Sequence, residues 1–196
     1  MKKVNSIVIF CASSLGNSAV YEEQASYVGK VLAEYGIRLV YGGGRVGLMG
    51  AVANGALAKG GEVIGVIPDF LNSKEREHKG VTKLITVDTM HDRKRIMSDY
   101  AEGVIALPGG FGTLEELFEM ITWAQLGLHK KPVGLLNING FYNHLIHFID
   151  HMVEEGLLKQ ENRAMLLVAD TIEALIEKMQ EYEAPLVPKW IEKDEI

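Results

Sequence analysis

The sequence has few of the features that mark a disulfide scaffold, a membrane protein or a disordered chain. It has a single cysteine, Cys11, so no internal disulfide can form. It has only 5 prolines beside 21 glycines, and apolar segments recur along the whole chain, which excludes a low-complexity protein. No stretch of about 18 apolar residues is present, so we expect no transmembrane helix.

An excess of positive charge is also lacking. The formal net charge is −6, so the chain is not basic enough overall to bind a nucleic-acid backbone non-specifically. The apolar run after Lys2 and Lys3 is too short for a secretory signal, and Asn5 and Ser6 interrupt it. We therefore expect a buried first strand there and a cytoplasmic protein.

The 196 residues, with 47% hydrophobic and 23% charged side chains, have the composition of one globular domain. Short apolar segments rich in β-branched residues alternate with helix-length segments. The expected strands are 4–10, 37–41, 62–67, 82–87, 103–107, 133–137 and 164–168. The expected helices are 18–35, 46–59, 91–101, 113–126, 141–155 and 171–181.

This alternation predicts a parallel sheet with helices on both faces, in a doubly wound, Rossmann-like α/β fold. We expect a single domain over 1–183 and an extended tail over 184–196. In such folds the ligand binds at the carboxyl ends of the strands.

A first glycine-rich turn covers residues 42–50. Gly42, Gly44 and Gly47 satisfy G-x-G-x-x-G, and Asp69 follows at roughly the spacing of a dinucleotide site. A nicotinamide-dependent oxidoreductase is therefore one alternative. The turn follows the second expected strand rather than the first, however, and close packing of a helix on the sheet would also explain its glycines.

A second glycine-rich turn covers residues 108–116. Its glycines would let backbone N–H groups approach an anion at a helix N-terminus, where the helix dipole favours negative charge. No Walker A pattern occurs in the chain. Two such turns at one edge of a sheet indicate a phosphorylated ligand.

Helical periodicity separates the two glutamates after this turn. Glu115 falls on a polar face, whereas Glu116 shares a face with Met120 and Trp123 and is expected to point into the protein or a cleft. A buried carboxylate needs a partner or a chemical role. Thr113 and Glu116 also fit a capping box, with Thr113 as the N-cap, and the sequence leaves both interpretations open.

Arg93 presents a similar problem. It falls on the apolar face of the helix expected over 91–101, where an arginine is costly unless a carboxylate or phosphate pairs with it. Lys94 beside it adds positive charge that suits an anionic ligand. The alternative is a surface helix whose arginine extends its charged end to solvent.

The histidines and Cys11 indicate no further chemistry. His147 and His151 lie one helical turn apart, but no carboxylate or cysteine has the usual ligand spacing beside them, so we expect surface histidines and no metal site. No base is indicated for Cys11, which we interpret as a core or rim residue.

Together these motifs resemble the LONELY GUY family of cytokinin riboside 5′-monophosphate phosphoribohydrolases, often labelled lysine decarboxylases. The resemblance is carried by residues 42–50, 90–94 and 108–116 and extends from 10–14 through 122–127 to 131–137. It implies hydrolysis of the N-glycosidic bond of AMP or an N6-prenylated AMP, giving the free base and ribose 5-phosphate. No metal or organic cofactor is implied.

The resemblance also implies roles for particular residues. Arg93 and Glu116 would be the catalytic pair, and Gly110, Gly112, Thr113 and Lys94 would contact phosphate and ribose. The full set of implied substrate contacts is Gly43, Gly44, Glu75, Met90, Lys94, Gly109, Gly110, Phe111, Gly112, Thr113, Glu115 and Thr122. Members of this short type are homodimers, which an apolar face of Leu114, Leu117, Phe118 and Ile121 would suit.

One rival function comes from another class. Similar proteins with the second glycine turn are carriers that bind ligands such as the molybdenum cofactor without turnover. The decarboxylase label itself we reject, because a pyridoxal enzyme needs a Schiff-base lysine in a larger scaffold and His129-Lys130 falls in an expected loop.

Overall fold

The computed structural model describes residues 3–71 and 77–185. Its centre is a seven-stranded sheet in the order β4-β3-β2-β1-β5-β6-β7, in which every strand pair is parallel. The strands are β1 (Ser6–Phe10), β2 (Arg38–Tyr41), β3 (Val63–Pro68), β4 (Lys83–Val87), β5 (Gly103–Ala106), β6 (Val133–Leu136) and β7 (Leu166–Ala169). The inner strands are mostly apolar because both sheet faces are covered; Ser6 and Arg38 begin β1 and β2.

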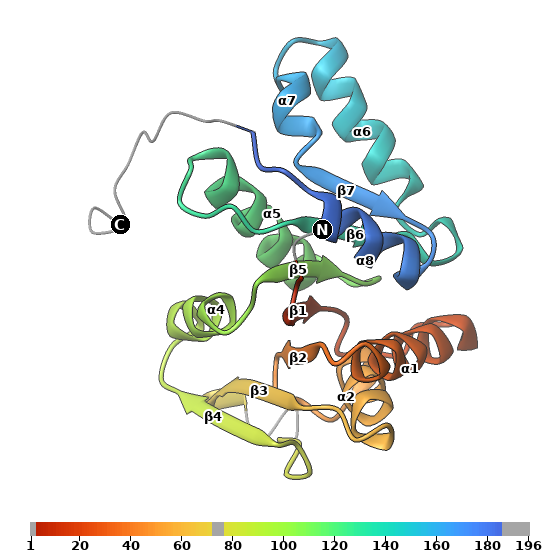
Figure 1. The fold of residues 1–196 in the computed structure, drawn as a ribbon, viewed down its shortest axis with the longest axis vertical. Coiled ribbons are helices and arrows are strands. Elements are labelled where there is room, and N and C mark those ends of the chain that lie inside the picture. The colour runs from red at the N-terminus through yellow and green to blue at the C-terminus, as the bar shows by residue number, and fades with distance from the viewer. Residues whose placement is uncertain (1–2, 72–76, 186–196) are drawn as a thin grey trace.

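Helices pack on both faces of this sheet (Figure 1). One face carries α1 (Ala19–Glu34), α2 (Gly47–Ala58) and α8 (Ile172–Glu181), whose apolar residues form one core with the sheet. The other carries α4 (Met90–Asp99), α5 (Phe111–Gln125) and α6 (Asn143–Glu154) over a second core. Short helical turns add η1 (Asp69–Leu71), η2 (Ile138–Gly140) and α7 (Gln160–Arg163).

The direction of strand addition reverses between β1 and β5. From β1 the chain adds β2, β3 and β4 on one side, and then crosses back to add β5, β6 and β7 on the other. The connections leaving β1 and β5 therefore diverge at the carboxyl edge, where a crevice forms in doubly wound folds. The predicted fold class is confirmed.

The expected strands and longer helices are all present, with ends that shift by a few residues. The largest difference that affects the site is at α5, which begins at Phe111 instead of 113. The short turns η1, η2 and α7 were not predicted. Within the described residues, no helix is both long and apolar enough to cross a membrane. From residue 186 onward, the expected tail lies outside the described residues.

Candidate active site

A pocket of about 390 Å³ lies at the carboxyl edge of the sheet, beside the point where strand order reverses. It is formed by the loop after β1, the beginnings of α2, α4 and α5, and the end of η1. The residues that line it are Cys11, Ala12, Ser13, Ser14, Met49, Leu71, Met90, Arg93, Gly110, Phe111, Gly112, Thr113, Glu115 and Glu116. Both predicted catalytic residues are among them.

The N-terminus of α5 forms one wall of the pocket. Gly110 is the N-cap in an extended conformation and offers no side chain to the first turn. The N–H groups of Phe111, Gly112 and Thr113 therefore have no acceptor within the helix, as at any helix start. This wall is suited to an anion.

Two glycines in this wall are explained neither by backbone conformation nor by packing. A Cβ added at Gly110 or Gly112 would have no atom within 4 Å, and neither residue has a positive φ. Gly109 differs, because its Cβ would lie 2.1 Å from Oγ1 of the buried Thr113. The open space at Gly110 and Gly112 is where a ligand can approach the backbone closely.

The two glutamates point as the helical periodicity predicted. Glu115 is exposed, with 54% of its side chain accessible, while Glu116 is half-buried and lines the pocket. The capping-box interpretation is wrong. Because α5 begins at Phe111, Thr113 is the third residue of the helix, and it cannot act as the N-cap that a capping box requires.

Arg93 is held by backbone carbonyl groups of β3 and of the turn that follows β2. Its side chain is buried, with Nε donating to the carbonyl oxygen of Val66 at 3.2 Å and Nη2 donating to that of Gly42 at 2.8 Å. Nη1 lies 3.8 Å from Sδ of Met90, another pocket residue. The sequence predicted a carboxylate or phosphate partner for this arginine but not these carbonyl groups, which fix the plane of its guanidinium at the pocket wall.

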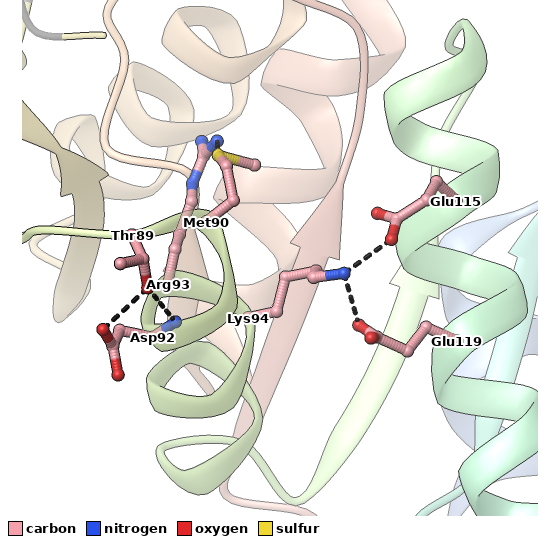
Figure 2. A network of polar contacts seen from close by, with 7 residues as sticks. All are labelled: Thr89, Met90, Asp92, Arg93, Lys94, Glu115 and Glu119. Atoms are coloured by element: carbon pink, nitrogen blue, oxygen red, sulfur yellow. Dashed lines mark hydrogen bonds and ion pairs between the residues drawn. The ribbon is translucent and has the colours of Figure 1, made fainter. Parts of the chain in front are cut away.

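A side-chain cap stabilises the first turn of α4, which carries Arg93. Thr89 is the N-cap of α4, and its Oγ1 accepts a hydrogen bond from the N–H of Asp92 at 3.0 Å. Thr89 Oγ1 also donates to Asp92 Oδ2 at 2.7 Å. Figure 2 draws both hydrogen bonds. The bond from the Thr89 hydroxyl, together with one from Arg95, holds the pKa of the Asp92 carboxyl below its ordinary value.

Lys94 points away from Arg93 and toward α5 (Figure 2). Its Nζ lies 2.5 Å from Glu115 Oε1 and 3.0 Å from Glu119 Oε2. Burial opposes the charge of Lys94, but its hydrogen bond to Glu115 and the negative charges of both glutamates outweigh this effect and raise its pKa. Lys94 is not among the described residues that line the pocket.

The first glycine turn packs mostly against protein. A Cβ at Gly42 would lie 2.2 Å from Arg93 Nη2, and one at Gly47 would lie 2.2 Å from the carbonyl carbon of Ser13. Gly43 accepts a backbone hydrogen bond from His78. Close packing, rather than a dinucleotide, therefore accounts for the spacing of this turn.

The structure does not bring every predicted contact to the pocket. Gly43, Gly44, Gly109 and Thr122 are not among its described lining residues, and Thr122 is exposed, about 15 Å along α5 from Gly112 at 1.5 Å per residue. The predicted contact Glu75 lies outside the described residues.

The described surroundings of four histidines indicate no metal site. The exposed His144, His147 and His151 lie on α6, and no described group of three or more His, Cys, Asp or Glu side chains could hold a metal ion. His129 links the end of α5 to β6, with Nε2 2.9 Å from the carbonyl oxygen of Met120 and Nδ1 accepting from the N–H of Lys131.

The sequence placed Cys11 in the core or at the rim but did not identify Ser13 and Ser14 as site residues. All three line the pocket at the loop after β1. Their position at the carboxyl end of a central strand, next to the strand that precedes the second glycine turn, was the available signal. Met49 at the start of α2 also lines the pocket and was not predicted as a site residue.

Comparisons with known proteins found relatives over most of the chain. A family described as possible lysine decarboxylase matches residues 49–179. Cytokinin riboside 5′-monophosphate phosphoribohydrolase LOG of Oryza sativa subsp. japonica is 49% identical over 176 residues, covering 90% of this chain and 73% of the relative. Cytokinin riboside 5′-monophosphate phosphoribohydrolase LOG3 of Arabidopsis thaliana is 47% identical over 180 residues, covering 92% of this chain and 84% of the relative.

A solved structure of lower identity has the same fold. The molybdenum cofactor carrier protein MCP from Chlamydomonas reinhardtii matches with a TM-score of 0.69 and 21% identity, covering 91% of this chain and 98% of that chain. That likeness establishes the fold alone. The much higher identity to the phosphoribohydrolases, over nine-tenths of the chain, shows that this chain belongs to the LOG family.

Proposed function

We propose that this protein hydrolyses the N-glycosidic bond of a nucleoside 5′-monophosphate, AMP or an N6-prenylated AMP, releasing the free base and ribose 5-phosphate. The observation that carries the proposal is the presence of Arg93, Glu116 and the open glycines of α5 in one pocket. The relatives named above, at 47–49% identity, support the same reaction.

In this proposal the 5′-phosphate binds at the N-terminus of α5. The N–H groups of Phe111, Gly112 and Thr113 and the helix dipole favour an anion there. The glycine positions 110 and 112 leave room for the phosphate oxygens to reach the backbone. The ribose then lies beside Glu116, less than two helical turns further along α5.

Glu116 acts on the sugar. The bond between C1′ and the purine nitrogen breaks with its electron pair leaving on the base, which gives the ribose oxocarbenium character. The carboxylate of Glu116 stabilises this positive charge and accepts a proton from the attacking water, whose oxygen bonds to C1′. The departing base takes up a proton, which balances the reaction.

Arg93 has two roles that fit its position. Its guanidinium, fixed by the carbonyl groups of Gly42 and Val66, can orient the phosphate-bearing ribose or stabilise the departing purine. The first role predicts a raised KM when Arg93 is replaced, and the second predicts a lowered kcat.

The proposal includes a homodimer formed through α5. Phe111 is 94% exposed, and Phe118, two helical turns further along α5, is also exposed. Leu117, which the sequence placed on the same apolar face, is buried in the core instead. Thr122 is exposed and lies six residues beyond Glu116, about 9 Å along α5 at 1.5 Å per residue, so in this proposal Thr122 contacts the substrate of a second copy.

The alternative function is a carrier that binds a nucleotide or the molybdenum cofactor without turnover. A base-release assay separates the two functions: purified protein is incubated with AMP and, separately, with N6-isopentenyl-AMP, and free base is followed by chromatography. Faster release from the prenylated nucleotide supports cytokinin activation, and equal rates support a general nucleotide glycosidase. Bound nucleotide with no released base supports the carrier.

A further inference from the structure

Lys94 connects the two helices that carry the proposed catalytic pair. It follows Arg93 on α4, and its Nζ contacts Glu115, which precedes Glu116 on α5. A second contact reaches Glu119, one turn further along α5 (Figure 2). Each member of the catalytic pair is therefore the immediate neighbour of a residue in this cluster.

The two-point contact restricts how the helices can move. An ammonium that touched one glutamate would allow α5 to rotate about its axis or slide along α4. Contact with carboxylates at positions i and i+4 of α5 opposes both movements, since they lie one above the other on one face.

The surroundings of Lys94 suit a fixed rather than a mobile cation. Its side chain is 11% exposed, so its contacts are screened less by solvent than those of an ordinary surface pair. The glutamates raise its pKa and keep it charged. Its ammonium is directed to α5, and Lys94 and Glu119 are both absent from the described lining of the pocket.

We propose that Lys94, Glu115 and Glu119 form a clamp between α4 and α5 that sets the spacing of Arg93 and Glu116. Lys94 and Glu119 are positioning residues in this proposal, and Lys94 acts through the clamp instead of contacting phosphate as the family resemblance implies. The inference rests on the proposed function, because it requires Arg93 and Glu116 to act on one substrate.

The most informative variant is Glu119→Gln, because this residue is outside the pocket and the change keeps its shape. We expect kcat for base release from the preferred nucleotide to fall about tenfold, since a small displacement of reacting groups has a large effect on rate. KM should stay within about twofold, because the phosphate site at α5 is unchanged. Lys59→Met, which removes an exposed ion pair with Glu34 away from α4 and α5, is the control and should retain wild-type kcat.

Two further variants separate the clamp from a phosphate contact. Lys94→Met should lower kcat by at least as much as Glu119→Gln, and combining them should lower it little further, because both changes break one interaction. Lys94→Arg, which restores a cation of similar reach, should recover most of kcat. The inhibition constant of ribose 5-phosphate should change less than about twofold in Lys94→Met, as expected for a residue without direct phosphate contact.

The outcomes are distinct. Wild-type kcat in Glu119→Gln, or a large rise in the ribose 5-phosphate inhibition constant in Lys94→Met, overturns the clamp while leaving the proposed function intact. Absence of base release by the wild-type protein overturns the proposed function and the clamp with it. Melting temperatures of all variants show whether a loss of kcat comes from loss of the fold.

Discussion

Nη2 of Arg93 donates a hydrogen bond to the carbonyl oxygen of Gly42 at 2.8 Å. A Cβ added to Gly42 would lie only 2.2 Å from the same nitrogen. The glycine therefore both accepts the hydrogen bond that orients the guanidinium and leaves room for it. One position in the first glycine turn thus connects the carboxyl end of β2 to the pocket.

Gly42→Ala is predicted to lower activity by displacing the guanidinium of Arg93. The atoms nearest the added methyl group are Nη2 of Arg93 and Sδ of Met49, so the arginine must leave its hydrogen bond to residue 42, and some stability is lost with it. We expect kcat/KM for base release to fall about 100-fold.

The control for Gly42→Ala is Gly134→Ala in β6. Its added methyl group would meet Cδ1 of the buried Leu175 at 2.8 Å, so this variant also disturbs a buried side chain, but away from the pocket. This control should keep wild-type kcat/KM. Equal activity in Gly42→Ala and Gly134→Ala would contradict a catalytic contribution from the position of Arg93.

Gly112→Ala should weaken substrate binding without weakening the fold. The methyl group meets no protein atom within 4 Å and occupies the space assigned to the phosphate, so we expect KM to rise roughly tenfold. Alanine in place of glycine in a helix should raise the free energy of unfolding by about 0.5 kcal/mol.

Gly36→Ala provides the opposite comparison. Its methyl group also meets no atom within 4 Å, but Gly36 has a φ of +67°, so alanine is strained there. We expect a lower melting temperature and an unchanged KM. If KM is unchanged in Gly112→Ala as well, the assignment of the phosphate to this wall of the pocket is contradicted.

His78 should make the fold less stable in mild acid. Its Nδ1 accepts from the N–H of Gly80 at 3.2 Å and its Nε2 lies 2.9 Å from Oδ1 of Asn54, which suits the neutral ring. Burial and the charge of Arg45 lower the pKa of His78 below its ordinary value.

The unfolded chain therefore takes up this proton at a higher pH than the folded protein. The stabilising contribution is present above about pH 6.5 and is lost as the pH falls through the lowered pKa. The drop in melting temperature between about pH 7.5 and about pH 5.5 should be smaller in His78→Gln than in wild type. His144→Gln, on the exposed face of α6, serves as control, and an identical drop in all three proteins would refute the assignment.

Phe118→Glu is predicted to separate the proposed homodimer. The substitution places a charge in the α5 surface that we assign to the interface, where it would be desolvated. Light scattering after size exclusion should give twice the mass of one chain for wild type and one chain for the variant. Phe148→Glu, at an exposed phenylalanine of α6, should stay dimeric, and a wild-type monomer would refute the interface.

Several features of the site could be predicted from helical periodicity. The period of 3.6 residues places Glu116 toward the pocket and Glu115 toward solvent, and it places Arg93 on the buried face of α4. The alternation of apolar segments and helices likewise predicted the parallel sheet. These features depend on the pattern of neighbouring residues, which can be read directly from one sequence.

Other features depend on contacts between distant segments. Nothing in the sequence pairs Arg93 with the carbonyl oxygen of Gly42, 51 positions away, or Lys94 with two carboxylates of α5. The sequence led us to expect an anion at both glycine turns, with helix packing as the alternative for the first. They differ because protein atoms fill the space at Gly42, whereas the space at Gly112 is open.

The start of α5 could not be located from its local pattern. Thr113 and Glu116 have capping-box spacing, but the N-cap is Gly110, three positions before Thr113, and the helix begins at Phe111. The buried Thr113 then packs over Gly109. A side chain that would fit a cap is used for packing in this fold.

The most direct test of the account compares turnover with binding in Glu116→Gln. This variant keeps the shape of the side chain and removes the charge that we assign to the ribose cation and the attacking water. Base release should fall about 1,000-fold or more, while the dissociation constant for the nucleotide, measured by calorimetry, should change less than about threefold. Turnover within about tenfold of wild type, or an equal loss of binding and turnover, would contradict the account.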